Sequence, residues 1–543
     1  MKKWKVLHKL KDESIINVLL ENRGIKTKKE IGEFLHPKLE DVTVKSVGID
    51  GVQLKKALQR IEEAIKKQEE IVVFGDYDVD GICGAAILWE TLFCLGARVM
   101  PYIPHRIDEG YGLSLAGISN VKSQMSNLKL IITVDNGIVA NEAVLFANKQ
   151  GIDVIITDHH VVGEILPKAY AIVHTTKLCG TGVAWVLAQE YKIQNTKYKI
   201  LDHLALVALA TVADLVPLTG ANRTLLMHGL SVLHKTKRLG IVAICEEAGI
   251  DQKTIETYEI GHVIAPRLNA AGRIEHAMDA LRLLCTKDTK RAKLLAQNLG
   301  ATNRERQDIT LESAQHAVSG IRNQESGIRK KLLFIAEEQY QQGVIGLVAG
   351  RLVEEFYRPA IVVSIGETHS KASARSIHGF NIIEFIRTAS HLLIDAGGHP
   401  MAAGFTVETA KLTLLQKHLE EKAEEIIDEA LLQRSLRIDC EIPIEIIDQH
   451  LYKELQALAP FGMKNPEPTF VSRNVVIEDM RLVGKDRKHV KFKFSIDAIG
   501  FGLGEKAGEF SVGDKVDIVY TIDENEWNGR KTLQLKVRDI KRN

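Results

Sequence analysis

The chain has 543 residues, of which 45% are hydrophobic and 26% are charged, and its formal net charge at pH 7 is +1. A chain of this length exceeds the size of a single core, so roughly three or four domains are expected. The near-neutral charge excludes a strong overall attraction to polyanions. Any nucleic-acid partner must therefore be bound by a localised surface.

No apolar run approaches the roughly 20 residues of a membrane span, so no membrane contact is expected. The opening MKKWKVLHKLKDESI lacks the continuous apolar segment of a secretory signal, which favours a cytoplasmic location. Six cysteines occur without a CxxC pair, and several lie among aliphatic residues. Reduced, buried thiols are the expectation.

In chain order, apolar and β-branched runs at 70–75, 98–103, 128–134 and 152–157 alternate with helix-like segments that close on glycine. This spacing predicts βαβ units and a parallel sheet, in which ligands gather outside the carboxyl ends of the strands. The run at 201–218 predicts a buried helix that Pro217 stops.

The rest of the chain predicts two more folded parts. Charged residues with spaced Leu and Ile predict a connecting helix, a second α/β unit follows it, and a Glu/Lys-rich helix at about 408–434 leads to many short strands typical of a small barrel. The expected domains are an N-terminal helical segment at 1–50, a catalytic domain at 51–284, the connecting helix at 285–325, the second α/β domain with its trailing helix at 326–434, and an OB-like β-barrel at 435–543.

Acidic residues and histidines follow the predicted strands. Asp76, Asp78 and Asp80 come after the first, Asp135 after the third, and Asp158-His159-His160 after the fourth, while Asp214 ends the predicted helix. In a parallel sheet these groups converge on one edge. So many carboxylates need positive charge, and oxygen-rich ligands with an imidazole suit Mn or Mg. We expect a pair of such ions that promotes phosphoester hydrolysis.

Each piece has a simpler interpretation. Asp135-Asn136-Gly137 is a turn signal by itself, Asp158 could cap a helix, and either histidine could be a satisfied core residue. The DxDxDG run could be a calcium loop, but the later Glu and the flanking helices of an EF-hand are missing. The combination of four acidic sites, three of them at strand ends, favours the metal site.

The ordered segments DYDVDG, VDNG, TDHH and VADLVPL resemble the DHH phosphoesterase superfamily. The segments PRLNAAGR, GVIGLVAGRL, SARSIHGFN and GGHPMAAGF, with the C-terminal APFGMKNPEPTF, resemble the RecJ family of single-strand-specific exonucleases within it. The resemblance runs over nearly the whole chain. It implies a parallel-sheet DHH domain, a DHH-associated α/β domain joined by a long helix, and an OB-type domain.

The resemblance implies a 5′ to 3′ exonuclease that degrades single-stranded DNA to mononucleotides in repair and recombination, with Mn or Mg as cofactor. Carried onto this sequence, the metal ligands are Asp76, Asp78, Asp80, Asp135, His159 and Asp214, with His160 as a further catalytic residue. Asp158 is expected to support them. We expect Asp135 to bridge the ions, because it follows the strand between the two other motif-bearing strands in sequence.

Phosphate binding is expected from residues within matching motifs, because guanidinium forks bind phosphate bidentately and glycine turns offer backbone N–H groups. Taken alone, an arginine is more often a surface residue. The expected phosphate-binding residues are Arg106, His160, Arg273, Ser373, Arg375 and His399.

The stretch RLVGKDRKHVKFKF is strongly basic. In a strand, Lys491 and Lys493 share one face while Phe492 and Phe494 share the other. One interpretation is that the lysines form a solvated face and the phenylalanines a packed one. An equally good interpretation is that this strand binds a single nucleic-acid strand, with Trp527 as a possible stacking residue.

Two rival functions stay open. One is a DHH-type phosphodiesterase for short oligonucleotides or cyclic dinucleotides, or a pyrophosphatase. The other is a replication scaffold without catalysis. Single-stranded DNA is the expected substrate and the protein is expected to be a monomer, while family resemblance adds a helicase and a single-strand-binding protein as partners.

Overall fold

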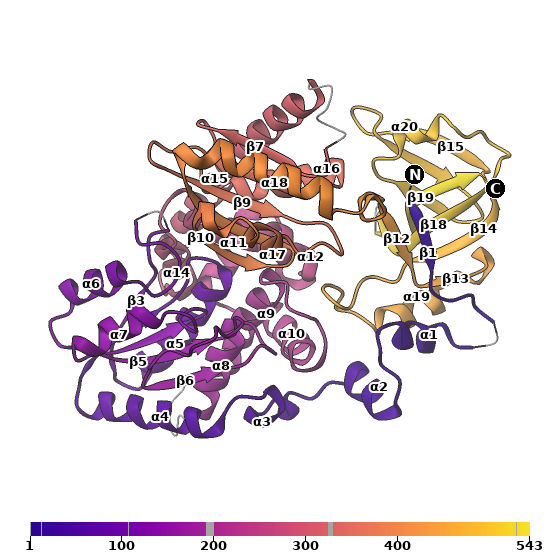
Figure 1. Ribbon diagram of the computed structural model, residues 1–543. Coiled ribbons are helices and arrows are strands. Elements are labelled where there is room, and N and C mark those ends of the chain that lie inside the picture. Colours follow the sequence, from indigo (N-terminus) through magenta and orange to yellow (C-terminus); the bar gives the residue numbers. More distant parts are fainter. Residues whose placement is uncertain are drawn as a thin grey trace. The chain divides into compact units, whose positions relative to one another are not determined.

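The computed structural model describes residues 2–11, 13–106, 108–191, 200–323, 330–527 and 529–542, although the side chains of residues 200, 201 and 527 lie outside the described part. The chain divides into two compact units, one of residues 1–4 and 301–436 and one of residues 5–300 and 437–543. Figure 1 colours the chain along its sequence, with the first α/β domain in indigo to magenta, the second α/β domain in orange and the C-terminal domain in yellow. Each unit is described by itself.

The predicted parallel sheet is confirmed. Its strands stand in the order β3-β2-β4-β5-β6, and every neighbouring pair is parallel. The strands are β2 (Glu70–Phe74), β3 (Arg98–Tyr102), β4 (Leu128–Val134), β5 (Asp153–Asp158) and β6 (Ala171–His174). Since β4 lies between β2 and β5, the three strands that carry the acidic motifs are neighbours.

Helices cover both faces of this sheet, which explains why its strands are apolar on both sides. Along β2, Ile71 and Val73 enter one core and Val72 and Phe74 the other. The first core holds α4 (Gly51–Lys66), α5 (Val79–Cys94), α8 (Gly180–Glu190) and α9 (Leu204–Ala213), and the second holds α6 (Leu115–Gln124) and α7 (Asn141–Lys149).

Helix α9 is shorter than the predicted 201–218 segment. A short 3-10 turn at Ile200–His203 precedes α9, which begins at Leu204 and ends at Ala213, with Asp214 as its C-cap. The domain continues through α10 (Gly220–Leu233), α11 (Leu239–Ala248), α12 (Thr257–Glu259), a π-helical turn at Ile260–Ile264, α13 (Ala265–Ile274) and α14 (Met278–Cys285). The connecting helix is α15 (Thr289–Asn323).

The second α/β domain has a mixed five-stranded sheet in the order β10-β11-β9-β8-β7, in which only the β7–β8 pair is parallel. Its elements are β7 (Leu333–Glu337), α16 (Ile345–Phe356), β8 (Ala360–Ser364), β9 (His369–Arg375), α17 (Ile382–Arg387), β10 (Leu393–His399), β11 (Ala402–Glu408) and α18 (Leu412–Ile426). The helix predicted at 408–434 is thus shorter, since the chain passes from α18 into a 3-10 turn at Glu429–Leu432.

The C-terminal domain is a seven-stranded sheet in the order β13-β14-β18-β19-β17-β16-β15. Its strands are β13 (Cys440–Glu441), β14 (Phe470–Val476), β15 (Asp479–Val483), β16 (His489–Lys493), β17 (Asp497–Gly500), β18 (Lys515–Trp527) and β19 (Arg530–Arg542), with α19 (Gln449–Gln456) and α20 (Gly504–Ala507). A short strand β12 (Ser435–Ile438) precedes it and pairs with β1 (Lys3–Val6).

The N-terminal helices share the core of the C-terminal domain. Leu19 of α1 (Ile15–Asn22) and Phe34 of α2 (Lys28–Leu35) belong to the same buried cluster as Leu455 of α19. A third short helix, α3 (Val44–Val47), leads into the domain of the parallel sheet. Among the described residues, no helix has the length and apolar character needed to cross a membrane.

Candidate active site

The DYDVDG loop joins β2 to α5 and places three aspartates differently. Asp78 is the N-cap of α5, where its Oδ1 accepts the backbone N–H groups of Asp80 and Gly81 at 2.9 and 3.2 Å. A Cβ at Gly81 would lie 2.4 Å from the backbone nitrogen of Asp76, so only glycine permits this tight turn. Asp76 is buried, and its Oδ1 meets no hydrogen-bond partner in the described part of the chain.

Asp80 is fixed by the N-terminus of helix α8. Its Oδ2 accepts the N–H of Gly180 at 2.6 Å and its Oδ1 accepts that of Thr181 at 2.7 Å. Backbone N–H groups at a helix N-terminus stabilise a carboxylate. Sequence reasoning identified Asp80 only as a metal ligand, and it missed Gly180 and Thr181 because nothing in the sequence pairs them with the first motif.

Asp135 follows β4 in a left-handed conformation, with φ at +63°. This conformation is costly for a residue with a Cβ, and such strain clusters at functional sites. Its backbone N–H donates to Thr157 on β5 at 3.0 Å, which holds the turn. A Cβ at Gly180 would lie 2.6 Å from the Cβ of Asp135, so α8 reaches the site only because glycine stands there.

Asn136 anchors the same turn to its surroundings. Its Nδ2 donates to the carbonyls of Phe74 at 3.2 Å and Val134 at 2.8 Å, and its Oδ1 accepts the N–H of Leu113 at 3.1 Å. The residue is buried. The Asp-Asn-Gly turn is therefore structural through Asn136 and part of the acidic cluster through Asp135.

Asp158 ends β5 and organises the two histidines that follow it. Its Oδ1 accepts the N–H groups of His159 and His160 at 2.7 and 3.1 Å, and it lies 2.8 Å from His160 Nδ1. Burial would raise the pKa of Asp158, but the hydrogen bond and charge of His160 lower it below its usual value. Conversely, burial opposes protonation of His160, yet the hydrogen bond and charge of Asp158 raise its pKa, which favours the charged imidazole.

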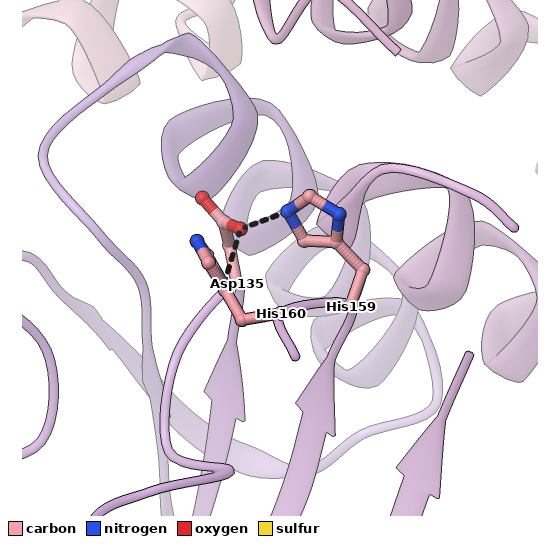
Figure 2. A group of neighbouring side chains, drawn as sticks. All are labelled: Asp135, His159 and His160. Carbon is pink, nitrogen blue, oxygen red and sulfur yellow. Dashed lines mark ion pairs between the residues drawn. The ribbon is translucent and has the colours of Figure 1, made fainter. Parts of the chain in front are cut away.

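His159 points its Nε2 into the acidic cluster. This atom lies 3.1 Å from Asp135 Oδ1, 3.6 Å from Asp214 Oδ2 and 3.7 Å from Asp80 Oδ2. Burial lowers the pKa of His159, which favours the neutral imidazole that can bind a metal ion. Figure 2 shows Asp135 facing both histidines. The distance between Asp135 Oδ1 and His160 Nδ1 is 3.8 Å.

The described residues contain three groups whose ligand atoms lie within 4.8 Å of one another, and they share members. The groups are Asp76, Asp78 and Asp135; Asp80, His159 and Asp214; and Asp135, His159 and His160. The parallel sheet thus brings together the seven residues that the sequence predicted as catalytic.

The acidic groups repel one another strongly in this site. Burial and then the neighbouring aspartates raise the pKa of Asp76, Asp78 and Asp135, and raise that of Asp214 to about 9. Asp135 Oδ1 and His159 Nε2 face each other at 3.1 Å without forming a hydrogen bond, and Asp76 Oδ1 is also buried without a hydrogen-bond partner in the described residues. Unpaired buried carboxylates are costly, and hard divalent cations compensate them best, so the donor set fits Mn²⁺ or Mg²⁺.

Two predicted phosphate-binding arginines lie beside the DYDVDG loop. The guanidinium of Arg106 lies 5.1 Å from the centre of the Tyr77 ring, and the charges of Arg106 and Arg273 both act on that residue. Helix α13, which carries Arg273, is tied to the loop because Asn269 Oδ1 accepts the N–H of Val79 at 2.8 Å. Sequence reasoning quoted Asn269 within a motif but gave it no role.

The other predicted phosphate-binding residues form a cluster on the mixed sheet. In its register, Ala402 of β11 faces Arg375 of β9 on one side and His399 of β10 on the other, so these two side chains share a face. Ser373 lies two residues before Arg375 on the same face. A Cβ at Gly346, near the N-terminus of α16, would lie 2.8 Å from Ser373 Oγ, which brings that helix end close to the cluster.

The basic strand β16 has the predicted alternation. Phe492 and Phe494 are buried and stack on each other at 5.5 Å, while Lys491 and Lys493 alternate with them and are partly exposed. Lys493 pairs with Asp497 at 3.1 Å. The phenylalanines therefore belong to the core, and the side chain of Trp527 lies outside the described part of the structure.

Known families match the three domains of the chain. Residues 70–211 match the model of the DHH family, N-terminal domain, residues 329–428 match the DHHA1 domain, and residues 438–539 match the RecJ OB domain. The chain is 37% identical to the single-stranded-DNA-specific exonuclease RecJ of Bacillus subtilis, over 97% of this chain and 67% of that protein. It is 31% identical to the exonuclease of the same name from Salmonella typhimurium, over 97% of this chain and 95% of that protein.

Solved structures agree with these matches. The Thermus thermophilus RecJ structure in complex with Mn²⁺ superposes with a TM-score of 0.84 at 28% identity, over all of this chain and 80% of that one. A structure of exonuclease RecJ bound to manganese has 32% identity and a TM-score of 0.60, over 71% of this chain and 98% of that one. A Mg²⁺ complex of the Thermus protein also matches, with a TM-score of 0.79.

The fold and the acidic and histidine cluster define a phosphoesterase of the DHH class. Within that class, the C-terminal domain and the relatives that span nearly the entire chain decide the assignment: the chain belongs to the RecJ family. The manganese and magnesium complexes of its relatives agree with the cation type that the donor set here requires.

Proposed function

We propose that this protein is a metal-dependent exonuclease that degrades single-stranded DNA in the 5′ to 3′ direction to mononucleotides. The observation that carries this proposal is the sharing of Asp135 by two of the three candidate ligand groups, on a chain of the RecJ family. Such sharing is what a bridging carboxylate between two ions requires. A role in DNA repair and recombination follows from the family resemblance.

Different residues of the site are proposed to bind the metal ions and the phosphate. Asp76, Asp78, Asp80, Asp135, His159 and Asp214 would hold the ions, which polarise a phosphate and lower the pKa of a bound water when present. Asp158 orients His160 through Nδ1 and raises its pKa, which favours the charged form. We therefore assign to His160 the binding of a non-bridging oxygen of the phosphate that is attacked.

Arg106 and Arg273 are proposed to bind phosphates of the strand near this site, because both lie beside the DYDVDG loop. Ser373, Arg375 and His399, on one face of the mixed sheet, are proposed to bind a terminal phosphate. A substrate with a 5′-hydroxyl in place of the 5′-phosphate should then be digested more slowly, and Arg375→Ala should reduce that difference.

The C-terminal domain is proposed to bind the same strand farther from the site of hydrolysis. Across the sheet, Arg481 faces Lys491, Lys491 faces Ile499, and Ile499 faces Lys536, so three cations lie in one row. Lys493 lies two residues from Lys491 on the same face. Basic surfaces of OB domains track a single-stranded backbone, whereas the stacking role predicted for Trp527 stays a prediction.

Digestion of a single strand labelled at either end, with Mn²⁺, Mg²⁺ or a chelator, tests chemistry, polarity and metal dependence together. We expect release from the 5′ end with either ion and none with the chelator. Asp135→Asn should lose nucleotide release, and retention of normal release by this variant would contradict the proposed metal centre.

The rival functions are separated by substrate length and by turnover. A phosphodiesterase for short oligonucleotides or cyclic dinucleotides, or a pyrophosphatase, would prefer those substrates to a 40-mer. A replication scaffold would bind metal but hydrolyse none of these substrates. The basic row on the C-terminal domain favours a long polymer.

A helicase and a single-strand-binding protein as partners, a monomeric state and a cytoplasmic location stay predictions from the sequence and the family resemblance. Size-exclusion chromatography with light scattering would test the monomer. Co-purification from cells would test the partners.

A further inference from the structure

Tyr111 lies beside the acidic cluster, in a loop whose conformation depends on two glycines. Gly110 and Gly112, on either side of it, adopt φ values of +82° and +65°, which favour glycine. The residue after them, Leu113, is held by the buried Asn136 through its backbone N–H. The position of Tyr111 is thus determined by the same turn that carries Asp135.

The hydroxyl of Tyr111 reaches two groups of the active site. It donates to the backbone carbonyl of Asp135 at 3.3 Å and lies 3.2 Å from Nε2 of His160. The ring makes perpendicular contacts with the rings of Tyr77 and His160, at centroid distances of 6.1 and 6.0 Å. These contacts fix the orientation of the side chain.

Despite these contacts, Tyr111 is 52% exposed. An exposed aromatic residue is ordinary in itself. Tyr111 differs because its ring is held at its hydroxyl end by the residues that surround the metal ligands. A held ring loses little conformational freedom when it binds a flat partner, so it is suited to stacking.

We propose that Tyr111 is a substrate-positioning residue whose exposed ring stacks on the base of the nucleotide being removed. This inference rests on the proposed exonuclease function and names how the terminal nucleotide is held. Stacking suits an enzyme that must accept any sequence, because every base has a π-face and no hydrogen-bond pattern is read. The rigid ring would align the sugar and phosphate of that nucleotide with His160 and the metal ligands.

The test compares two 5′-phosphorylated strands that differ only at the terminal nucleotide, which carries either a base or an abasic tetrahydrofuran residue. For the wild type, loss of the base should lower kcat/KM roughly 10- to 100-fold, the usual range for stacking of a base on an aromatic side chain. Tyr111→Leu should lower kcat/KM on the intact strand by a similar factor, mainly through KM. On the abasic strand, Tyr111→Leu and the wild type should be nearly equal.

Tyr111→Phe separates the ring from the hydroxyl. It should keep the wild-type preference for the intact terminus while lowering kcat, because His160 loses its contact with the hydroxyl. Tyr170 provides the matched control, since it stands at the amino end of β6, opposite the edge that carries the active site, and packs on Lys56 at 4.8 Å. Tyr170→Leu should behave as the wild type on both strands.

Mn²⁺ binding by calorimetry supplies a readout that is independent of turnover, and it should be unchanged in Tyr111→Leu. The proposal is overturned if the penalty for removing the base is the same in Tyr111→Leu and the wild type, or if both Tyr111 variants lose Mn²⁺ binding. The first outcome leaves the exonuclease function intact. Absence of nucleotide release by the wild type from either strand would instead contradict the proposed function itself.

Discussion

Thr181 donates two hydrogen bonds to Asp80, one from its backbone and one from its side chain. The backbone N–H of Thr181 donates to Asp80 Oδ1 at 2.7 Å, and the Thr181 hydroxyl donates to the Asp80 carbonyl at 2.6 Å. Both residues are buried. A proposed metal ligand is thereby fixed by a residue 101 positions further along the chain.

Thr181→Val should weaken this arrangement, because the shape of the side chain stays while the hydroxyl is lost. The carbonyl of Asp80 then keeps only its hydrogen bond within α5 and loses the Thr181 hydroxyl, which should cost about 1 kcal/mol of unfolding free energy. Mn²⁺ affinity should fall as well, since partners that orient metal ligands contribute about 10- to 100-fold. Urea unfolding and calorimetry measure the two effects, and Thr181→Ser should preserve both properties.

Gly180→Ala should damage the site directly. The added Cβ would lie 2.6 Å from the Cβ and 2.8 Å from the Cα of Asp135, so either α8 or the Asp135 turn must move. We expect at least about a tenfold loss in Mn²⁺ affinity. Gly320→Ala in α15 is the control, because nothing lies within 4 Å of its added Cβ. Equal Mn²⁺ affinity in the two variants would refute the close approach.

Metal binding should release protons. Without an ion, burial and then Asp80 and Asp78 raise the pKa of Asp214 to about 9, so at pH 7.5 this carboxyl is protonated. A bound cation requires the carboxylate, and the proton must leave. Calorimetry in buffers of different ionisation enthalpy should therefore give different heats, and Asp214→Asn should release about one proton fewer. Buffer-independent heats would argue against this electrostatic account.

Acid should destabilise the catalytic domain through Glu90. This buried carboxylate lies 2.7 Å from Arg238 and 3.1 Å from His203. Burial raises the pKa of Glu90, but His203 and Arg238 outweigh it and lower the pKa to about 2. Because the folded pKa is depressed, the stabilisation is complete above the unfolded value near 4.5 and disappears as pH falls toward 2.

The size of this effect is about 3 kcal/mol at neutral pH, from a shift of roughly two to three pKa units. Glu90→Gln should be strongly destabilised at pH 7 and should lose part of the stability change between pH 5 and 3. Chemical denaturation at several pH values measures it. Glu63→Gln, which alters an exposed pair with Lys67, should follow the wild type.

Arg223 should be essential for the attachment of the C-terminal domain to the catalytic domain. This buried residue of α10 donates to three backbone carbonyls, those of Leu458 at 3.0 Å, Ala459 at 2.7 Å and Phe34 at 2.8 Å. Its guanidinium also lies over the ring of Phe34. Arg223→Met would leave these carbonyls unpaired, at a cost of about 2–4 kcal/mol. Proteolysis between the two domains should be faster in this variant. Arg282→Met, which removes an exposed pair with Asp279, should change neither the stability nor the rate of proteolysis.

Much of the site could be predicted because the period of the strands and the position of the acidic motifs are local properties. Asp76, Asp135 and Asp158 each follow an apolar run, and a parallel sheet has only one carboxyl edge on which they can meet. The roles of Asn136, Gly180 and Tyr111 could not be predicted in this way. Their partners lie in other motifs, and a single sequence does not encode which loop packs against which helix in any local pattern.

The sequence by itself determined the parallel sheet, the ligand types and the cation they require. The reason is that the hydrophobic period of a strand and the density of carboxylates in a motif depend only on neighbouring residues in the chain. The tertiary structure decided how the aspartates differ: Asp78 caps its own helix, Asp80 is held by α8, and Asp158 orients His160. It also placed α1 and α2 in the core of the C-terminal domain. The reason is that a carboxylate or an apolar face can be satisfied by many partners, and only the packed chain selects among them.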